Sequence, residues 1–172
     1  MGKTLVAAHT GCGIHPDNTL ASFLEGIQLG ADIVEVDVRV SHDGTPILLH
    51  DDSPYLLSHT YEQLNRYPDI QVMMNTPDEL LPQQTRQYEQ FAESVCRDAR
   101  EQGYAGLNMN ADTCRQQIVD LAHTMGLKVW VYTVNERSDM ERFVRMGIDA
   151  ITSRKPLMLI ELLKVCMDLK KP

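Results

Sequence analysis

The sequence predicts an α/β fold with a mainly parallel sheet. Short apolar segments typical of buried strands alternate along the chain with segments whose apolar residues recur at helical spacing. The 172 residues are the length of one domain, so we expect residues 1–172 to form a single domain. The candidates for parallel strands are the segments 5–9, 32–38, 55–58, 70–74, 105–109, 128–134 and 149–152.

The N-terminal segment is expected to be a strand followed by a helix. Residues 5–9 form a short apolar run that indicates a buried strand. The side-chain oxygens of Asn18 and Thr19 can cap free backbone amides, and the apolar residues after them keep helical spacing as far as Gly30. We therefore expect a helix that begins at Asn18-Thr19 and ends at Gly30.

Residues 32–50 are expected to form an antiparallel hairpin. Side chains alternate along its first strand, so that Glu35 and Asp37 share one face. The Asp-Gly pair at 43–44 is typical of a hairpin turn, and the connection is too short for a parallel crossover. With a two-residue turn there, Asp37 would lie opposite His50.

The rest of the chain alternates between strands and helices, with a short helical piece expected near 61–67. Three further helices are expected to end at Gly103, Gly126 and Gly147. Capping-box patterns at 76–79 and 138–141 mark the starts of the first and third of these helices. A last helix is expected from Pro156 to about residue 169.

Composition excludes several classes of function. Lys and Arg number 16 against 24 Asp and Glu, a net charge of -8, which argues against nucleic acid as a partner. A phosphate substrate stays compatible with this charge, because a metal ion supplies positive charge locally. The sequence has no apolar run of the ~20 residues that a membrane span needs, and no signal-peptide pattern. The four cysteines are scattered without a C-x-x-C motif, which favours reduced thiols and a cytoplasmic protein.

Two carboxylates and two histidines are the candidates for chemistry. Glu35 and Asp37 share a strand face, His9 ends the first strand, and His50 ends the hairpin. Neighbouring carboxylates repel each other unless a cation lies between them, and oxygen ligands suit Mg²⁺ or Ca²⁺ better than Zn²⁺. The alternative is an edge strand whose acidic residues face water, because periodicity does not separate a barrel interior from solvent.

Several motifs, in the same order along the chain, resemble the glycerophosphodiester phosphodiesterase family. They are A-H-T-G at 8–11, P-D-N-T-L-A-S-F at 16–23, G-A-D-I-V-E-V-D-V at 30–38, D-G-T-P-I-L-L-H-D at 43–51, G-L-K-V-W-V-Y-T-V-N at 126–135 and G-I-D-A-I-T at 147–152. The resemblance implies a TIM-type (β/α) barrel. It also implies metal-dependent hydrolysis of glycerophosphodiesters to glycerol 3-phosphate and an alcohol, an activity of lipid and glycerol metabolism.

The resemblance also implies roles for the four candidate residues. His9 and His50 would be the general acid/base pair, since histidine exchanges a proton near neutral pH. Glu35 and Asp37 would hold Mg²⁺ or Ca²⁺, which stabilises phosphate oxygens.

Substrate-binding positions depart from the family's pattern. Thr10 stands where the family has an arginine that clamps phosphate with a planar fork. Asp17 replaces a glutamate and Tyr132 replaces a tryptophan, and both are expected to contact substrate. Arg39 either replaces part of the lost clamp or lies at the strand end as a rim arginine. Asn135 is expected to cap the helix that follows it.

A segment of the family's pattern is missing from the middle of the chain. The strand with I-E-x-K, which carries a third carboxylate ligand and a lysine, has no room between the hairpin and the candidate strand at 55–58. The strand count indicates the same gap, because the chain has seven candidate parallel strands, whereas a closed barrel has eight and usually ~250 residues. We therefore expect an incomplete or distorted barrel that lacks about one βα unit.

The sequence thus predicts an active phosphodiesterase whose substrate is a small-molecule phosphodiester. Two alternatives stay open: a shortened, non-catalytic relative that at most binds a phosphorylated ligand, and a phosphodiesterase acting on lysophospholipids. A gap in the barrel exposes strand edges. Either the hairpin fills this gap within a monomer, or two chains pair there as a homodimer.

Overall fold

The chain folds as two compact units. The first comprises Met1–Leu5 and Gln71–Ile151, and the second comprises Val6–Ile70 and Thr152–Pro172. The structure is a computed structural model that describes residues 3–10, 12–40, 46–48, 74–75 and 85–168.

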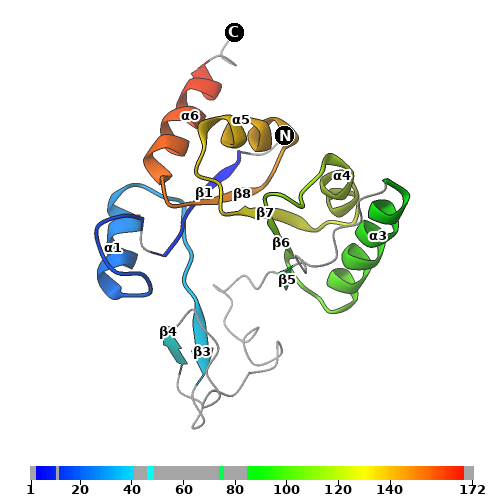
Figure 1. The fold of residues 1–172 in the computed structure, drawn as a ribbon, viewed down its shortest axis with the longest axis horizontal. Helices are drawn as coiled ribbons and strands as arrows, with labels where there is room; N and C mark the ends of the chain where they lie inside the picture. Colours follow the sequence, from blue (N-terminus) through cyan, green and yellow to red (C-terminus); the bar gives the residue numbers. More distant parts are fainter. Residues whose placement is uncertain (1–2, 11, 41–45, 49–73, 76–84, 169–172) are drawn as a thin grey trace. The chain divides into compact units, whose positions relative to one another are not determined.

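The first unit contains a parallel sheet with its helices (Figure 1). Its strands lie in the order β5, β6, β7, β8, and each neighbouring pair is parallel. The strands are β5 (Met74–Asn75), β6 (Gly106–Asn110), β7 (Lys128–Tyr132) and β8 (Ala150–Ser153), of which the last two residues belong to the second unit. The helices are α3 (Thr85–Glu101), α4 (Gln116–Thr124) and α5 (Arg137–Met146).

The core of the first unit follows from strand alternation and helical spacing. Val129 and Val131 on β7 are fully buried, and the residues between and after them are half-buried on the other face of the sheet. Helix α3 packs on β6 and α4, and its buried face is Tyr88, Ala92, Val95, Cys96 and Ala99. Helix α5 ends at Gly147, whose φ of 80° is the left-handed conformation that glycine adopts without strain.

The second unit begins with a parallel βαβ arrangement. It contains β1 (Leu5–Ala8), of which Leu5 belongs to the first unit, α1 (Leu20–Gln28), β2 (Ile33–Val34), β3 (Val38–Val40), β4 (Pro46–Leu48) and α6 (Pro156–Asp168). Strand β1 pairs in parallel with β2, where Ala7 lies opposite Ile33. The His9 amide donates to the Ser153 carbonyl oxygen over 3.0 Å, so β8 ends beside β1.

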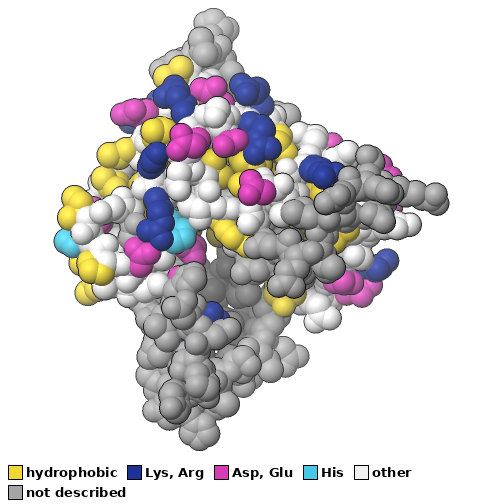
Figure 2. Space-filling view, viewed as in Figure 1, with side chains coloured by type: hydrophobic (Ala, Val, Ile, Leu, Met, Phe, Trp, Pro, Cys, Tyr) yellow, Lys and Arg dark blue, Asp and Glu magenta, His cyan; other side chains and the backbone are white. Residues whose placement is uncertain are grey.

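Helix α1 is fixed at its start by reciprocal hydrogen bonds. The Thr19 hydroxyl accepts from the Ser22 amide, and the Ser22 hydroxyl accepts from the Thr19 amide. Among the described contacts of this helix, Ser22 and Gly26 form the buried side. The apolar residues Leu20 and Ile27 are 71% and 51% exposed, and Figure 2 shows hydrophobic side chains over this region.

The expected hairpin exists, but it is shorter than predicted and its register differs. Strands β3 and β4 form a separate antiparallel sheet, so the antiparallel connection is confirmed. The expectation of one strand over 32–38 is wrong, because β2 ends at Val34 and β3 starts at Val38. Val38 lies opposite Leu48, one residue away from the register in which Asp37 faces His50. His50 itself lies outside the described residues.

Two helix-start predictions on α5 are wrong. The N-cap residue is Glu136, without a side-chain hydrogen bond, so neither Asn135 nor a capping box at 138–141 starts this helix. Ser138 lies inside the first turn. The other helix ends agree with their glycine signals, and α6 starts at Pro156 as predicted.

Some predicted elements lie outside the described residues. They are the strand at 55–58, the helical piece near 61–67, most of the strand at 70–74 and the capping pattern at 76–79. Within the described ranges, every helix is too short or too polar to cross a membrane.

Candidate active site

His9 lies directly after β1, at the carboxyl end of the strand. Its Nδ1 is 3.0 Å from the carbonyl oxygen of Thr10. A carbonyl oxygen only accepts hydrogen bonds, so this contact places the imidazole proton on Nδ1. The neutral ring then has Nε2 as its proton acceptor, the form that a general base requires.

Thr10 connects the strand end to the loop that follows it. The residue is 2% exposed, and its hydroxyl accepts a hydrogen bond from the Asn18 amide. Its own amide donates to Glu35 Oε2 over 3.5 Å. The position at which the resemblance implies a phosphate-binding arginine is therefore a buried structural position in this chain.

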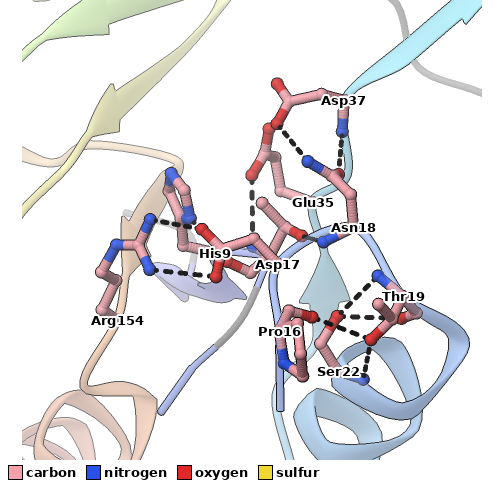
Figure 3. A network of polar contacts seen from close by, with 10 residues as sticks. His9, Pro16, Asp17, Asn18, Thr19, Ser22, Glu35, Asp37 and Arg154 are labelled. Carbon is pink, nitrogen blue, oxygen red and sulfur yellow. Dashed lines mark hydrogen bonds and ion pairs between the residues drawn. The ribbon is translucent and has the colours of Figure 1, made fainter. Parts of the chain in front are cut away.

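Glu35 and Asp37 lie in the segment between β2 and β3 (Figure 3). The Glu35 amide donates to the Ala8 carbonyl oxygen over 2.9 Å, which continues the pairing of β1 with β2. The Asn18 side chain holds Asp37 through both its backbone amide and its carboxylate. The Asp37 amide donates to Asn18 Oδ1 over 3.0 Å, and Asn18 Nδ2 donates to Asp37 Oδ2 over 3.1 Å.

Asn18 was not predicted as a site residue. Its φ of 57° lies in the left-handed region, which asparagine tolerates better than most residues. The signal in the sequence was its place before Thr19, which was interpreted as helix capping alone. The structure shows that Thr19 makes the cap while Asn18 orients a carboxylate.

Arg154 is the second residue that the sequence analysis missed. It directly follows β8, and its Nη1 and Nη2 donate to the two oxygens of Asp17 over 3.3 and 2.7 Å. The hydrogen bond to Asp17 raises the pKa of Arg154; burial opposes this rise, and the charges of Asp17 and Glu35 add to it. A strand end beside His9 was the available signal, since functional residues of parallel barrels gather at the carboxyl ends of strands.

Carboxylates dominate the charge of this cluster (Figure 3). Asp17, Glu35 and Asp37 carry three negative charges against the one positive charge of Arg154, a net charge of -2 with neutral His9. Within the described residues, no group of three or more His, Cys, Asp or Glu side chains could hold a metal. Two carboxylates nevertheless suit Mg²⁺, which keeps several waters in its shell.

The remaining predicted residues are distributed over both units. Arg39 is half-buried on β3, opposite Ile47. Tyr132 is the last residue of β7 in the first unit. Cys12 is not among the predicted site residues, and burial raises the pKa of its thiol, which disfavours the thiolate that a nucleophile needs.

A cavity of about 660 Å³ lies in the first unit, near the starts of β7 and β8. At its wall His123 Nε2 is 2.8 Å from Asp149 Oδ2, which also accepts from the Val129 amide over 2.8 Å. His123 lies on α4, and these contacts give it a structural role that joins α4 to the sheet. The amino ends of barrel strands serve stability more often than catalysis.

The fold and the cluster together define an α/β protein of the TIM type, with a histidine and two neighbouring carboxylates after its parallel strands. The chain matches the Glycerophosphoryl diester phosphodiesterase family over residues 9–68 and 53–158, and it belongs to this family. The two matched pieces overlap at 53–68, next to the position at which the sequence analysis places the missing unit.

Curated relatives align with part of the chain. A glycerophosphodiester phosphodiesterase of Caldanaerobacter subterraneus subsp. tengcongensis is 44% identical over 52 residues, which is 30% of this chain and 21% of the relative. Glycerophosphodiester phosphodiesterase 1 of Rattus norvegicus is 36% identical over 88 residues, 44% of this chain and 26% of the relative. The chain thus spans about a fifth to a quarter of the length of these relatives.

Solved structures confirm the TIM-type α/β fold. A glycerophosphodiester phosphodiesterase from Parabacteroides distasonis matches with a TM-score of 0.66 and 18% identity, covering 96% of this chain and 98% of its own. An Oleispira antarctica phosphodiesterase in complex with the product sn-glycerol-3-phosphate matches with a TM-score of 0.62 and 21% identity. The match covers 95% of this chain and 96% of the Oleispira chain. The family is generally dependent on divalent metals.

Proposed function

We propose that this protein hydrolyses glycerophosphodiesters to glycerol 3-phosphate and an alcohol, with a divalent metal ion. The observation that carries the proposal is His9, whose Nδ1 proton is fixed on a carbonyl oxygen, in one cluster with the carboxylates of Glu35 and Asp37. Membership of the family and the product complex of the Oleispira relative support the same reaction.

In this proposal His9 handles a proton at Nε2. The ring takes a proton from the attacking water as the water oxygen forms a bond to phosphorus. The bond from phosphorus to the departing alcohol breaks, and that alcohol oxygen takes up a proton. The resemblance to the family implies His9 and His50 as an acid/base pair, so His50 would donate this second proton.

Glu35 and Asp37 would hold the metal, Mg²⁺ or Ca²⁺, when it is bound. The ion would supply positive charge to the phosphate oxygens. Asn18 fixes Asp37 through two hydrogen bonds, and Thr10 contacts Glu35, so both carboxylates are oriented before an ion arrives. Such prepositioning lowers the cost of organising the site.

The test is the hydrolysis of glycerophosphocholine, followed as release of glycerol 3-phosphate, with added Mg²⁺ or Ca²⁺ and with a chelator. His9→Ala should lower the rate about 10²- to 10⁴-fold, because it removes the acid/base group. His15→Ala is the matched control, since His15 is an exposed loop histidine whose amide, not its ring, bonds Glu25. A His9→Ala variant as active as the control contradicts the proposal.

A second candidate function is binding of a phosphorylated ligand without turnover. The observation that favours it is Thr10, buried and hydrogen-bonded where a phosphate-binding arginine is the family's residue. Calorimetric binding of glycerol 3-phosphate by a protein that releases no product from glycerophosphocholine or lysophosphatidylcholine would support this function. Turnover of lysophosphatidylcholine alone would support the lysophospholipid alternative.

A further inference from the structure

We propose that Arg154 binds the phosphate group of the substrate, and so replaces the arginine that the family carries at position 10. This inference rests on the proposed function and names a residue for one part of it. It assigns the phosphate-binding guanidinium to the end of β8 instead of the end of β1.

The backbone places Arg154 at the same end of the sheet as His9. The His9 amide donates to the carbonyl oxygen of Ser153, the residue directly before Arg154. Figure 3 shows His9, Arg154 and Asp17 converging from β1, from the turn after β8 and from the loop before α1. A guanidinium anchored here lies beside the general base, where the reacting phosphate has to be held.

The charge of the cluster requires a cation of this kind. Asp17, Glu35 and Asp37 are acidic, and a phosphodiester adds another negative charge. A divalent ion between Glu35 and Asp37 would balance those two carboxylates, and among the labelled residues of the described cluster Arg154 is the one with a cationic fork to offer the phosphate. Arginine offers a planar fork of N–H donors that matches two phosphate oxygens.

The pair with Asp17 is better explained by positioning than by stability. Arg154 and Asp17 are 45% and 44% exposed, and ion pairs this exposed contribute little to the free energy of unfolding. The exposure leaves the guanidinium within reach of a ligand from solvent. The two hydrogen bonds to Asp17 nevertheless fix the plane of the fork, so Asp17 acts as a positioning residue for Arg154.

The experiment measures glycerol 3-phosphate binding by calorimetry with Mg²⁺ present, and KM for glycerophosphocholine. Arg154→Gln should weaken binding and raise KM about 10- to 100-fold, the loss expected for a charged hydrogen-bonding partner. Arg154→Lys should lie between Arg154→Gln and the parent, because lysine keeps the charge without the fork. The unfolding midpoint should stay near that of the parent, which separates this role from a structural one.

Two further variants test specificity. Lys155→Gln removes one positive charge from the adjacent exposed residue and should weaken binding about threefold at most, through the general field alone. Asp17→Asn removes the carboxylate that positions the Arg154 guanidinium but leaves its charge in place, so it should weaken binding by less than Arg154→Gln does. Equal losses in Lys155→Gln and Arg154→Gln, or a loss in Asp17→Asn as large as in Arg154→Gln, overturn the inference.

Failure of the inference is distinguishable from failure of the proposed function. A parent protein that hydrolyses glycerophosphocholine or binds glycerol 3-phosphate, with Arg154→Gln unchanged, overturns the role of Arg154 alone. A parent protein that does neither overturns both.

Discussion

Replacing Asn18 by alanine is expected to lower the free energy of unfolding by about 3 kcal/mol. The variant loses the bond from the Asp37 amide, worth about 0.5 kcal/mol, and the bond to the Asp37 carboxylate, worth about 1.5 kcal/mol. Alanine at a φ of 57° adds about 1 kcal/mol of left-handed strain. The half-buried setting of these bonds places each contribution at the low end of its range.

Glycine at position 18 separates the loss of hydrogen bonds from the backbone strain. Asn18→Gly loses the same hydrogen bonds but accepts the left-handed backbone, so it should be about 1 kcal/mol more stable than Asn18→Ala. Urea unfolding, with midpoint and slope fitted for each variant, measures the difference. Asn110→Ala is the control, because Asn110 Oδ1 accepts one exposed bond from the Asp112 amide, worth about 1 kcal/mol at most.

The same variants report on the metal site. Release of Asp37 in Asn18→Ala and Asn18→Gly should reduce the rise in melting temperature produced by Mg²⁺, and Asn110→Ala should leave that rise intact. The reasoning is refuted if Asn18→Ala and Asn18→Gly unfold at the same urea concentration, or if Asn18→Ala costs no more than Asn110→Ala.

Two further outcomes concern charge. Mg²⁺ or Ca²⁺ should raise the melting temperature of the parent protein, because an ion bound only by the native state stabilises it; Glu35→Gln and Asp37→Asn should each reduce this rise, and a parent without any rise contradicts the assignment. Burial raises the pKa of Tyr88 to about 12, of Cys96 to about 11 and of Cys114 to about 12, so the folded state favours their neutral forms. Their contribution is therefore fully present below the unfolded thiol pKa of about 8.5 and is lost as pH rises toward 12. Urea unfolding between about pH 8 and pH 11.5 should show this decline, and a flat profile contradicts it.

Local patterns explain which elements were predictable from the sequence. The capping residue Thr19, the apolar spacing of α3 and the terminating Gly147 act within a few residues of themselves, so the helix ends they predict agree with the structure. Family motifs placed His9, Glu35 and Asp37 in one cluster for a similar reason, since each lies inside or at the end of a predicted strand. These roles stay predictions until activity and metal binding are measured.

Long-range contacts explain what was missed. Arg154 and Asp17 are 137 residues apart in the chain, and the pair forms only because β8 ends beside β1. The alternation of 32–38 predicted one strand, but the bonds from Asn18 hold Asp37 outside both β2 and β3. Periodicity reports which side chains share a face, and it contains no information about a competing partner elsewhere in the chain.

The last prediction concerns Gly106, a glycine inside the expected strand at 105–109. Glycine weakens a strand, so its presence there indicates close approach of another backbone. A methyl group on Gly106 would collide with the Lys128 backbone, whose carbonyl carbon and amide nitrogen would lie 2.7 and 2.8 Å away. Gly106→Ala must therefore push β6 from β7, and should lower the free energy of unfolding by about 2 to 3 kcal/mol. Gly103→Ala is the matched control: it meets no atom within 4 Å and carries only the strain of a φ of 73°, about 1 kcal/mol. Urea unfolding compares the two, and the packing argument is wrong if Gly106→Ala is as stable as Gly103→Ala.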